Sequence, residues 1–249
     1  CSINADQNML TKLISYEENV RFGVYLGGKD TLNLFVPLTG SCYFVRRSVI
    51  EGVCGWDCKF LSEDMELAAR LLEGGYQTKF APDVLSWQEN PSNFTQLLRQ
   101  RLRWFRGCME VALRYGRLVV KKPGMRSVDA EMTLSGPYML PLSLVNYVMT
   151  LCALFGGIRL DPLFTFFIYG VSVLSVVSLF VIGLALVSVI RPKRISNLLW
   201  LPFVYAYWGL QILLSVFAFF QILLRRQRKW LKTVKGGVIT NPALKSYDN

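Results

Sequence analysis

Two neighbouring carboxylates open an amphipathic stretch in the first third of the chain. Ser62 precedes Glu63 and Asp64, and apolar residues follow at helical spacing, which predicts a helix beginning at this point. The positive end of the helix dipole favours the ionised form of a carboxyl group. An ionised carboxylate can take a proton from a hydroxyl group, although an acidic pair is also typical of an ordinary helix N-terminus.

A second set of chemically useful side chains lies in the run Q-R-L-R-W at positions 100–104. Gln100, Arg103 and Trp104 are at positions i, i+3 and i+4, so on a helix they share one face, and Gly107 continues it. An arginine fork pairs with phosphate oxygens, and an indole ring offers a flat apolar surface. The face therefore suits a sugar phosphate. The alternative is a basic helix that lies against membrane headgroups.

A third candidate is the turn Thr39-Gly40-Ser41, in which a glycine between two hydroxyl residues lets the backbone approach a ligand closely. The same three residues also make an ordinary turn. The motif gains weight only from its place ahead of the acidic pair and the Q-R-L-R-W run.

The residue types that the chain lacks exclude several kinds of chemistry. It has no histidine, and none of its six cysteines forms a C-x-x-C pair. Ser-His-Asp and Cys-His catalysis are therefore excluded, and the usual zinc sites are not expected. Any acid–base chemistry falls mainly to carboxylates.

The elements that must position these residues have the pattern of a soluble α/β domain. Helices are expected at residues 9–18, 62–73 and 92–114, with Ser62 and Ser92 as candidate N-caps. Short apolar runs that end at proline or turn residues are expected as strands at 32–36, 42–45 and 76–80. Residues 1–115 are accordingly assigned to a partial catalytic domain, and 116–135 to a basic connector at the membrane interface.

The second half of the chain is typical of a membrane protein. Hydrophobic residues make up 52% of the sequence, and the mean hydropathy is +0.33. Three apolar segments within residues 136–224 are each long enough to cross a bilayer, at 136–158, 162–190 and 197–224. The basic residues around them would all prefer the cytoplasmic side, which three full crossings do not allow. One segment is therefore expected to be interfacial or re-entrant, and the first, with Pro137 and Pro141, is the best candidate.

The net charge of +11 fits the same assignment. Many of the basic residues flank the apolar segments, where lysine and arginine normally anchor a protein to lipid headgroups. Membrane lipids are therefore expected partners, and nucleic acid is not. Residues 225–249 are expected to be a basic polar tail without a core of its own.

In order and spacing, these features resemble the C-terminal catalytic part of membrane glycosyltransferases of family 2, such as the synthases of cellulose, chitin, hyaluronan and poly-N-acetylglucosamine. The resemblance extends from Val36 to Gly107 and includes G-W-D at 55–57, E-G-G-Y at 73–76 and E-N-P at 89–91. The K-W-L-K-T stretch at 229–233 also resembles the family's tail. It implies the C-terminal half of a GT-A domain followed by transmembrane helices.

The resemblance also implies a role for each candidate residue. Asp64 matches the general base that activates an acceptor hydroxyl for inverting transfer. Gln100 and Arg103 match residues near the donor diphosphate and the acceptor. Glu63 and Arg101 are expected to bind substrate with them. Trp104 would stack on the acceptor sugar, and Thr39, Gly40 and Ser41 would line the acceptor site. The expected reaction is sugar transfer from a nucleotide sugar to a growing polysaccharide, processively, at the cytoplasmic face of the plasma membrane.

One departure from the family pattern limits this assignment. Family members carry a D-x-D motif that binds a divalent cation, magnesium or manganese, and the nucleotide diphosphate, and this sequence contains no D-x-D. The cation is therefore expected for a complete enzyme, with ligands outside this chain, and the isolated chain is expected to be inactive. Alternatives are transfer of a single sugar to a lipid acceptor, or a membrane fragment without catalysis.

Overall fold

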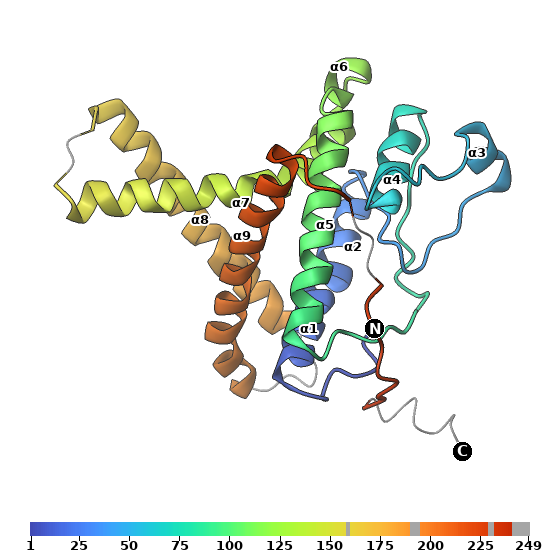
Figure 1. Ribbon diagram of the computed structural model, residues 1–249, viewed down its shortest axis with the longest axis horizontal. Helices are drawn as coiled ribbons and strands as arrows, with labels where there is room; N and C mark the ends of the chain where they lie inside the picture. Colours follow the sequence, from blue (N-terminus) through green and yellow to red (C-terminus); the bar gives the residue numbers. More distant parts are fainter. Residues whose placement is uncertain (158–159, 190–194, 229–231, 241–249) are drawn as a thin grey trace.

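The computed structural model describes the backbone of residues 1–157, 160–189, 195–228 and 232–240, and in these ranges the fold is helical. Figure 1 shows α5 near the centre, with α4 on one side and α9 on the other. The elements in chain order are α1 (Met9–Val20), the π-helix η1 (Arg21–Tyr25), α2 (Leu26–Thr31), α3 (Arg47–Gly52), α4 (Glu63–Glu73), α5 (Phe94–Tyr115), α6 (Leu118–Lys121), α7 (Met125–Phe155), α8 (Pro162–Val189), the 3₁₀-helix η2 (Ile195–Trp200) and α9 (Leu201–Leu223).

The expectation of an α/β fold is wrong for the described residues, which contain no β-strand and only one isolated bridge, between Ser2 and Gln88. The runs at 32–36, 42–45 and 76–80 are irregular. A strand requires a neighbouring strand to satisfy its backbone groups. Here other partners satisfy them: the Phe35 N–H donates to Asp129 Oδ2 (3.0 Å), and the Val36 carbonyl accepts from the Thr78 hydroxyl (2.5 Å).

The helices expected around the candidate site are confirmed, with corrected ends. The first runs from Met9 to Val20, and the second begins at Glu63 as expected. The third is α5, whose N-cap is Asn93 rather than Ser92, because Asn93 Oδ1 accepts the N–H of Thr95 (2.8 Å).

Two apolar clusters hold these helices around α5. One joins α4, α5, α6 and α7 through buried residues that include Met65, Ala68, Val111, Leu118 and Leu134. The other joins α1, α5, α8 and α9 through residues that include Ile14, Leu97, Leu186, Val204 and Tyr207. Because α5 contributes to both clusters, it connects α4 to the long apolar helices α8 and α9.

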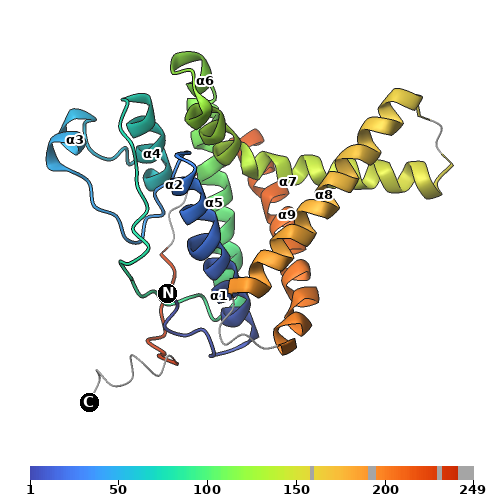
Figure 2. The ribbon, with the colours of Figure 1, turned by 180° about the vertical axis from the view of Figure 1, so that it is seen from behind.

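Three helices are long and apolar enough to cross a membrane, over Met125–Phe155, Pro162–Leu186 and Leu198–Leu223. The first begins well before residue 136, so most of the expected connector is helical. In Figures 1 and 2, α7 and α8 leave the molecule together, and α7 runs across the direction of α9. Two helices that cross in this way cannot both lie along the membrane normal.

Pro137 and Pro141 both lie inside α7 without ending it. Pro141 has no N–H, so the carbonyl of Pro137, four residues earlier, loses its helical partner. The Ser215 hydroxyl of α9 donates to that carbonyl, and a neighbouring helix thus satisfies the freed group. The proline pair is accommodated because α9 packs against α7 at this point.

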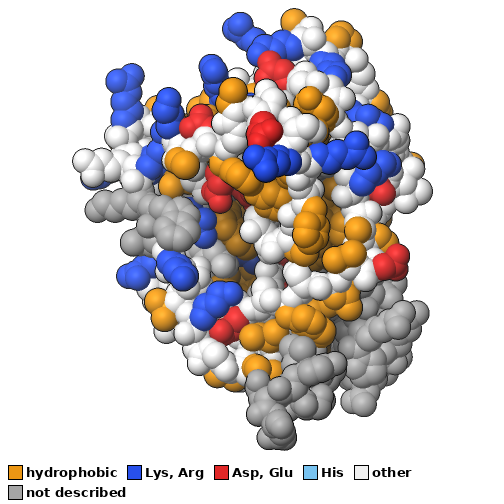
Figure 3. All heavy atoms as spheres, turned by 90° about the vertical axis from the view of Figure 1, so that its right-hand side faces the viewer, with side chains coloured by type: hydrophobic (Ala, Val, Ile, Leu, Met, Phe, Trp, Pro, Cys, Tyr) orange, Lys and Arg blue, Asp and Glu red, His pale blue; other side chains and the backbone are white. Residues whose placement is uncertain are grey.

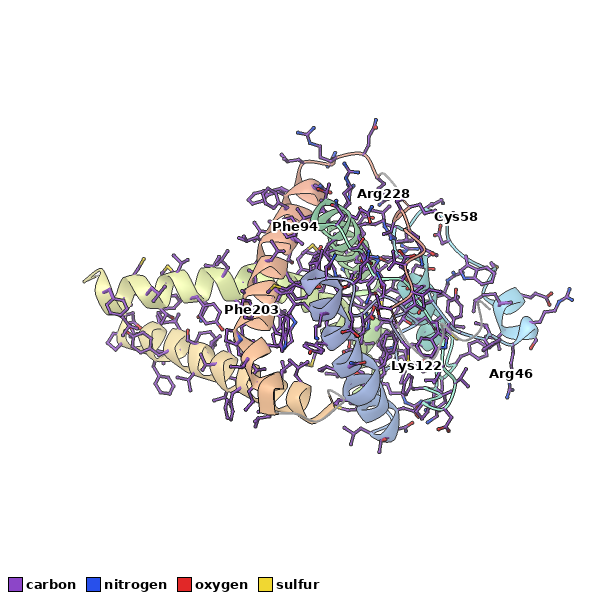
Figure 4. All side chains as sticks on the ribbon, turned by 90° about the horizontal axis from the view of Figure 1, so that it is seen from below. Arg46, Cys58, Phe94, Lys122, Phe203 and Arg228 are labelled. Atoms are coloured by element: carbon purple, nitrogen blue, oxygen red, sulfur yellow. The ribbon has the colours of Figure 1, made fainter. Side chains whose placement is uncertain are left out.

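Residues 225–228 and 232–240, the described part of the segment after α9, return toward α5 (Figure 1). The Arg106 guanidinium binds the carbonyls of Arg226 and Gln227, and Arg228 Nε lies 2.9 Å from Glu110 Oε2. Figure 4 labels Arg228 close to Cys58, in agreement with the bond from Arg228 to the Lys59 carbonyl (3.1 Å).

Candidate active site

The acidic pair is positioned by a close approach between α4 and α5. Gly107 of α5 lies against Ser62, the residue before α4, and a Cβ at Gly107 would be 2.9 Å from Ser62 Cβ. Ser62 occupies the N-cap position, but its side chain makes no capping hydrogen bond and faces α5 instead. The glycine predicted on the Gln100 face thus has a packing role, because it lets the start of α4 approach α5 closely.

Asp64 lies against the turn that the sequence analysis singled out. A Cβ at Gly40 would be 2.9 Å from Asp64 Oδ2, and Gly40 has φ +72°, a conformation that favours glycine. Asp64 Oδ1 accepts the N–H of Met65 (2.8 Å). The structure therefore brings the Thr39-Gly40-Ser41 turn to the carboxylate, although these residues are far apart in sequence.

The surroundings of Asp64 favour its protonated form. Burial raises the pKa of Asp64 above the ordinary value of an aspartate, and the charge of Glu63 raises it further. The N–H of Met65 and the charge of Arg21 act in the opposite direction. A carboxylate with a raised pKa has a higher affinity for a proton, which suits a group that must accept one.

Arg103 faces the acidic pair from α5. Burial lowers the pKa of its guanidinium, whereas the charges of Glu63 and Asp64 favour the charged form. The site thus combines a carboxylate that accepts a proton with a cation that can pair with a phosphate oxygen.

Two further residues lie around Asp64 that no sequence pattern predicts. Arg21 comes from η1, and Cys108 follows Gly107 on α5. Burial and the charge of Asp64 raise the pKa of Cys108 to about 12, so its thiol is protonated at neutral pH and is not a nucleophile. Both reach Asp64 only through the packing of η1 and α5 near α4, which local sequence signals do not encode.

Gln100 lies beneath the segment that follows α9. Its Nε2 is 3.5 Å from the Thr233 hydroxyl, and residues 232–235, with Lys232 and Lys235, line an open hollow. Figure 3 shows the face that carries α3 and α4, where lysine and arginine side chains outnumber acidic ones. Lys232, the sequence neighbour of Thr233, therefore lies in the segment that covers Gln100.

Arg101 and Trp104 lie in different surroundings from Arg103. Arg101 is buried, and its Nη2 donates to Glu17 Oε2 of α1 (2.8 Å). Its Cζ lies 4.5 Å from the centroid of the Trp104 ring, which is half-buried. Arg103 thus faces α4, whereas Arg101, which does not belong to the predicted face of Gln100, Arg103 and Trp104, is held against α1 and contacts Trp104.

The side-chain chemistry of the described residues does not fit a divalent-cation site. No group of three Asp, Glu, Cys or His side chains gathers in this part of the chain. Oxygen ligands are what magnesium and manganese require in proteins. No step below is therefore assigned to a metal ion.

Comparison with known proteins gives a match to one protein family. The model of the family described as "Glycosyl transferase family group 2" matches residues 1–224. A probable glycosyltransferase of Bacillus subtilis, YdaM, is 35% identical over 113 residues, which are 45% of this chain and 27% of that protein. The poly-beta-1,6-N-acetyl-D-glucosamine synthase of Staphylococcus epidermidis is 24% identical over 246 residues, which are 96% of this chain and 57% of that protein.

An N-acetylglucosaminyltransferase of Bradyrhizobium diazoefficiens is 25% identical over 148 residues, which are 56% of this chain and 30% of that protein. The chain thus spans between 27% and 57% of the length of these three relatives. No solved structure matches it.

Proposed function

We propose that this chain, which belongs to glycosyl transferase family group 2, carries the acceptor side of a membrane glycosyltransferase. The proposed enzyme extends a polysaccharide with sugar from a nucleotide-sugar donor. The observation that carries the proposal is the meeting of Gly40, Asp64 and Arg103 from three separate elements. Two relatives are named for N-acetylglucosamine chemistry, which makes that sugar the first donor to test.

The proposed reaction is an inverting displacement at the anomeric carbon. Asp64 takes the proton from an acceptor hydroxyl, and the oxygen forms a bond to the anomeric carbon of the donor sugar. The bond from that carbon to the donor phosphate breaks, and the nucleoside diphosphate leaves with the electron pair. The raised pKa of Asp64 supports the role of base, because the product of the step is a protonated carboxyl.

The neighbouring residues orient the two substrates in this scheme. Arg103 faces the acidic pair and would pair with a donor phosphate oxygen. Trp104, one residue further along α5, would provide the flat surface for the acceptor ring. The close contact between Gly40 and Asp64 leaves the Thr39–Ser41 turn beside the acceptor hydroxyl.

Processive synthesis at the cytoplasmic face of the plasma membrane is the finer form of the proposal. The three long apolar helices support a location in a membrane. The crossed directions of α7 and α9 favour α7 as the interfacial helix, with the site held at the membrane surface (Figure 1). Transfer of a single sugar to a lipid acceptor is the alternative, and the size of the product separates the two.

The test is made on the complete membrane-bound protein that contains this chain. Membranes are supplied with UDP-N-acetylglucosamine or UDP-glucose, and labelled product is separated by size. We expect polymer from one donor, loss of transfer in Asp64→Asn, and normal transfer in the exposed control Asp83→Asn. Normal transfer by Asp64→Asn would remove the assigned base, and a product of one sugar on lipid would replace the polysaccharide by the alternative.

A further inference from the structure

Three side chains from three helices form a chain of contacts that ends at Trp104. The Tyr207 hydroxyl of α9 donates to Glu17 Oε2 of α1 (2.7 Å). The same oxygen accepts from Arg101 Nη2 of α5 (2.8 Å), and the Arg101 guanidinium lies 4.5 Å from the Trp104 ring centroid. Each residue in this series touches the next one directly. The family resemblance assigns no role to Glu17 or Tyr207.

The contacts lie in an environment that restricts their motion. The Arg101 side chain is 7% exposed, and Tyr207 is 5% exposed within the apolar cluster of Leu13, Ile14 and Leu97. A buried guanidinium that donates to a carboxylate has a strongly preferred position, because that interaction is lost if the guanidinium moves away. The charge of Glu18 acts on Arg101 as well. Arg101 is therefore held in place by Glu17 while it contacts the Trp104 ring.

A cation over an indole ring restricts the ring as well. The attraction depends on the position of the charge relative to the ring face, so a fixed guanidinium favours one orientation of the ring. Trp104 is half-buried and lies at i+3 from Arg101, so part of its surface remains accessible.

We infer that Glu17 and Tyr207 are positioning residues that act through Arg101 to fix the orientation of Trp104 toward the acceptor sugar. The inference rests on the proposed function, because the acceptor platform is part of it. Tyr207 lies in one of the helices long enough to cross a membrane, so a membrane helix sets the geometry of the acceptor site. A purely structural ion pair would hold α1, α5 and α9 together without affecting Trp104.

Tyr207→Phe tests the inference with little risk to folding, because it keeps the buried ring and removes only the hydroxyl. Tyr205→Phe is the matched control: it is the same change in the same helix, and the Tyr205 hydroxyl donates to the Leu179 carbonyl (3.3 Å), away from Glu17. Glu17→Gln is the stronger second variant, since it removes the counter-charge of Arg101.

The first measurement does not depend on activity. The protein is labelled with 5-fluorotryptophan in nanodiscs, and the Trp104 resonance is assigned from its loss in Trp104→Phe. We expect Tyr207→Phe and Glu17→Gln to shift or broaden this resonance, and Tyr205→Phe to leave it unchanged. An unchanged Trp104 resonance in both test variants would overturn the inference, even if the proposed function stands.

The second measurement is a double-mutant cycle on transfer. Tyr207→Phe should raise the acceptor KM or lower the rate by at least about threefold, within the range of coupling between contacting residues. In a Trp104→Leu background the same change should add less than about twofold. Full additivity would mean that Tyr207 acts elsewhere and would overturn the inference. If the parent protein transfers no sugar, the proposed function fails, and the fluorine spectra alone decide whether Tyr207 positions Trp104.

Discussion

Replacing Gly107 by alanine tests whether the contact between α4 and α5 sets the position of the proposed base. The added Cβ would overlap the Ser62 hydroxyl and lie 2.9 Å from Ser62 Cβ and from Ser62 N. Carbon atoms in contact are normally about 3.5–4.0 Å apart, so the start of α4 must move by roughly 0.6–1.1 Å. Ser62 directly precedes Glu63 and Asp64, and the displacement is therefore passed to the carboxylate.

The expected effects on stability and on rate differ in size. Overpacking costs about 1–3 kcal/mol, and the higher helix propensity of alanine offsets about 1 kcal/mol of this. The protein should therefore remain folded, with a free energy of unfolding lower by at most about 2 kcal/mol. A shift of about 1 Å at a reacting group can lower the rate by about a hundredfold, so we expect transfer to fall by about ten- to a hundredfold.

The assay is the rate of sugar transfer per molecule of membrane-inserted protein, measured beside thermal unfolding. Gly28→Ala is the matched control, because Gly28 lies in helix α2 and an added Cβ there would meet nothing within 4 Å. The control should transfer at the parent rate. If Gly107→Ala behaves like Gly28→Ala in both measurements, the close approach of α4 and α5 does not position Asp64, and the reasoning is refuted.

Three further predictions concern the same site. Asp64→Asn should raise the melting temperature at pH 7, because a carboxyl whose pKa is raised by folding destabilises the native state once it is ionised. This gain in melting temperature should vanish below about pH 4, where the carboxyl is protonated in both states. No gain at pH 7 would contradict the argument from burial. The rate of transfer should fall as the pH drops through the pKa of Asp64, which lies above the ordinary aspartate value of about 3.9. Glu63→Gln should move this acidic limb of the pH–rate profile to lower pH. An unmoved limb would show that Glu63 does not raise the pKa of Asp64. Trp104→Leu should lower transfer per inserted molecule by at least about tenfold, whereas a normal rate would make Trp104 a membrane anchor.

The sequence predicted the helices around the candidate site, because helix formation depends on local signals. The periodic apolar positions after Ser62 and after residue 92 specify α4 and α5. Length and hydropathy alone were sufficient for the three apolar helices. The family resemblance was likewise visible in short motifs, and the family match over residues 1–224 confirmed it.

The strands were predicted wrongly because strand formation depends on a neighbour. The runs at 32–36, 42–45 and 76–80 have strand composition but are irregular. In the first run, backbone groups of Phe35 and Val36 bond to the side chains of Asp129 and Thr78 instead of to a strand. The composition of a segment indicates its propensity to form a strand, but it does not indicate whether a partner strand is present.

What the sequence by itself determined is the identity of the chemical groups: a carboxylate pair at a helix start, a basic and aromatic face on α5, and apolar helices after them. Only the tertiary structure decided which of these groups contact one another. It placed Gly40 beside Asp64 and Arg103 near the acidic pair. It placed Arg101 in a hydrogen bond with Glu17 and against the Trp104 ring. The physical reason is that helix periodicity fixes which residues share a face, whereas the partner of that face depends on packing between segments distant in sequence.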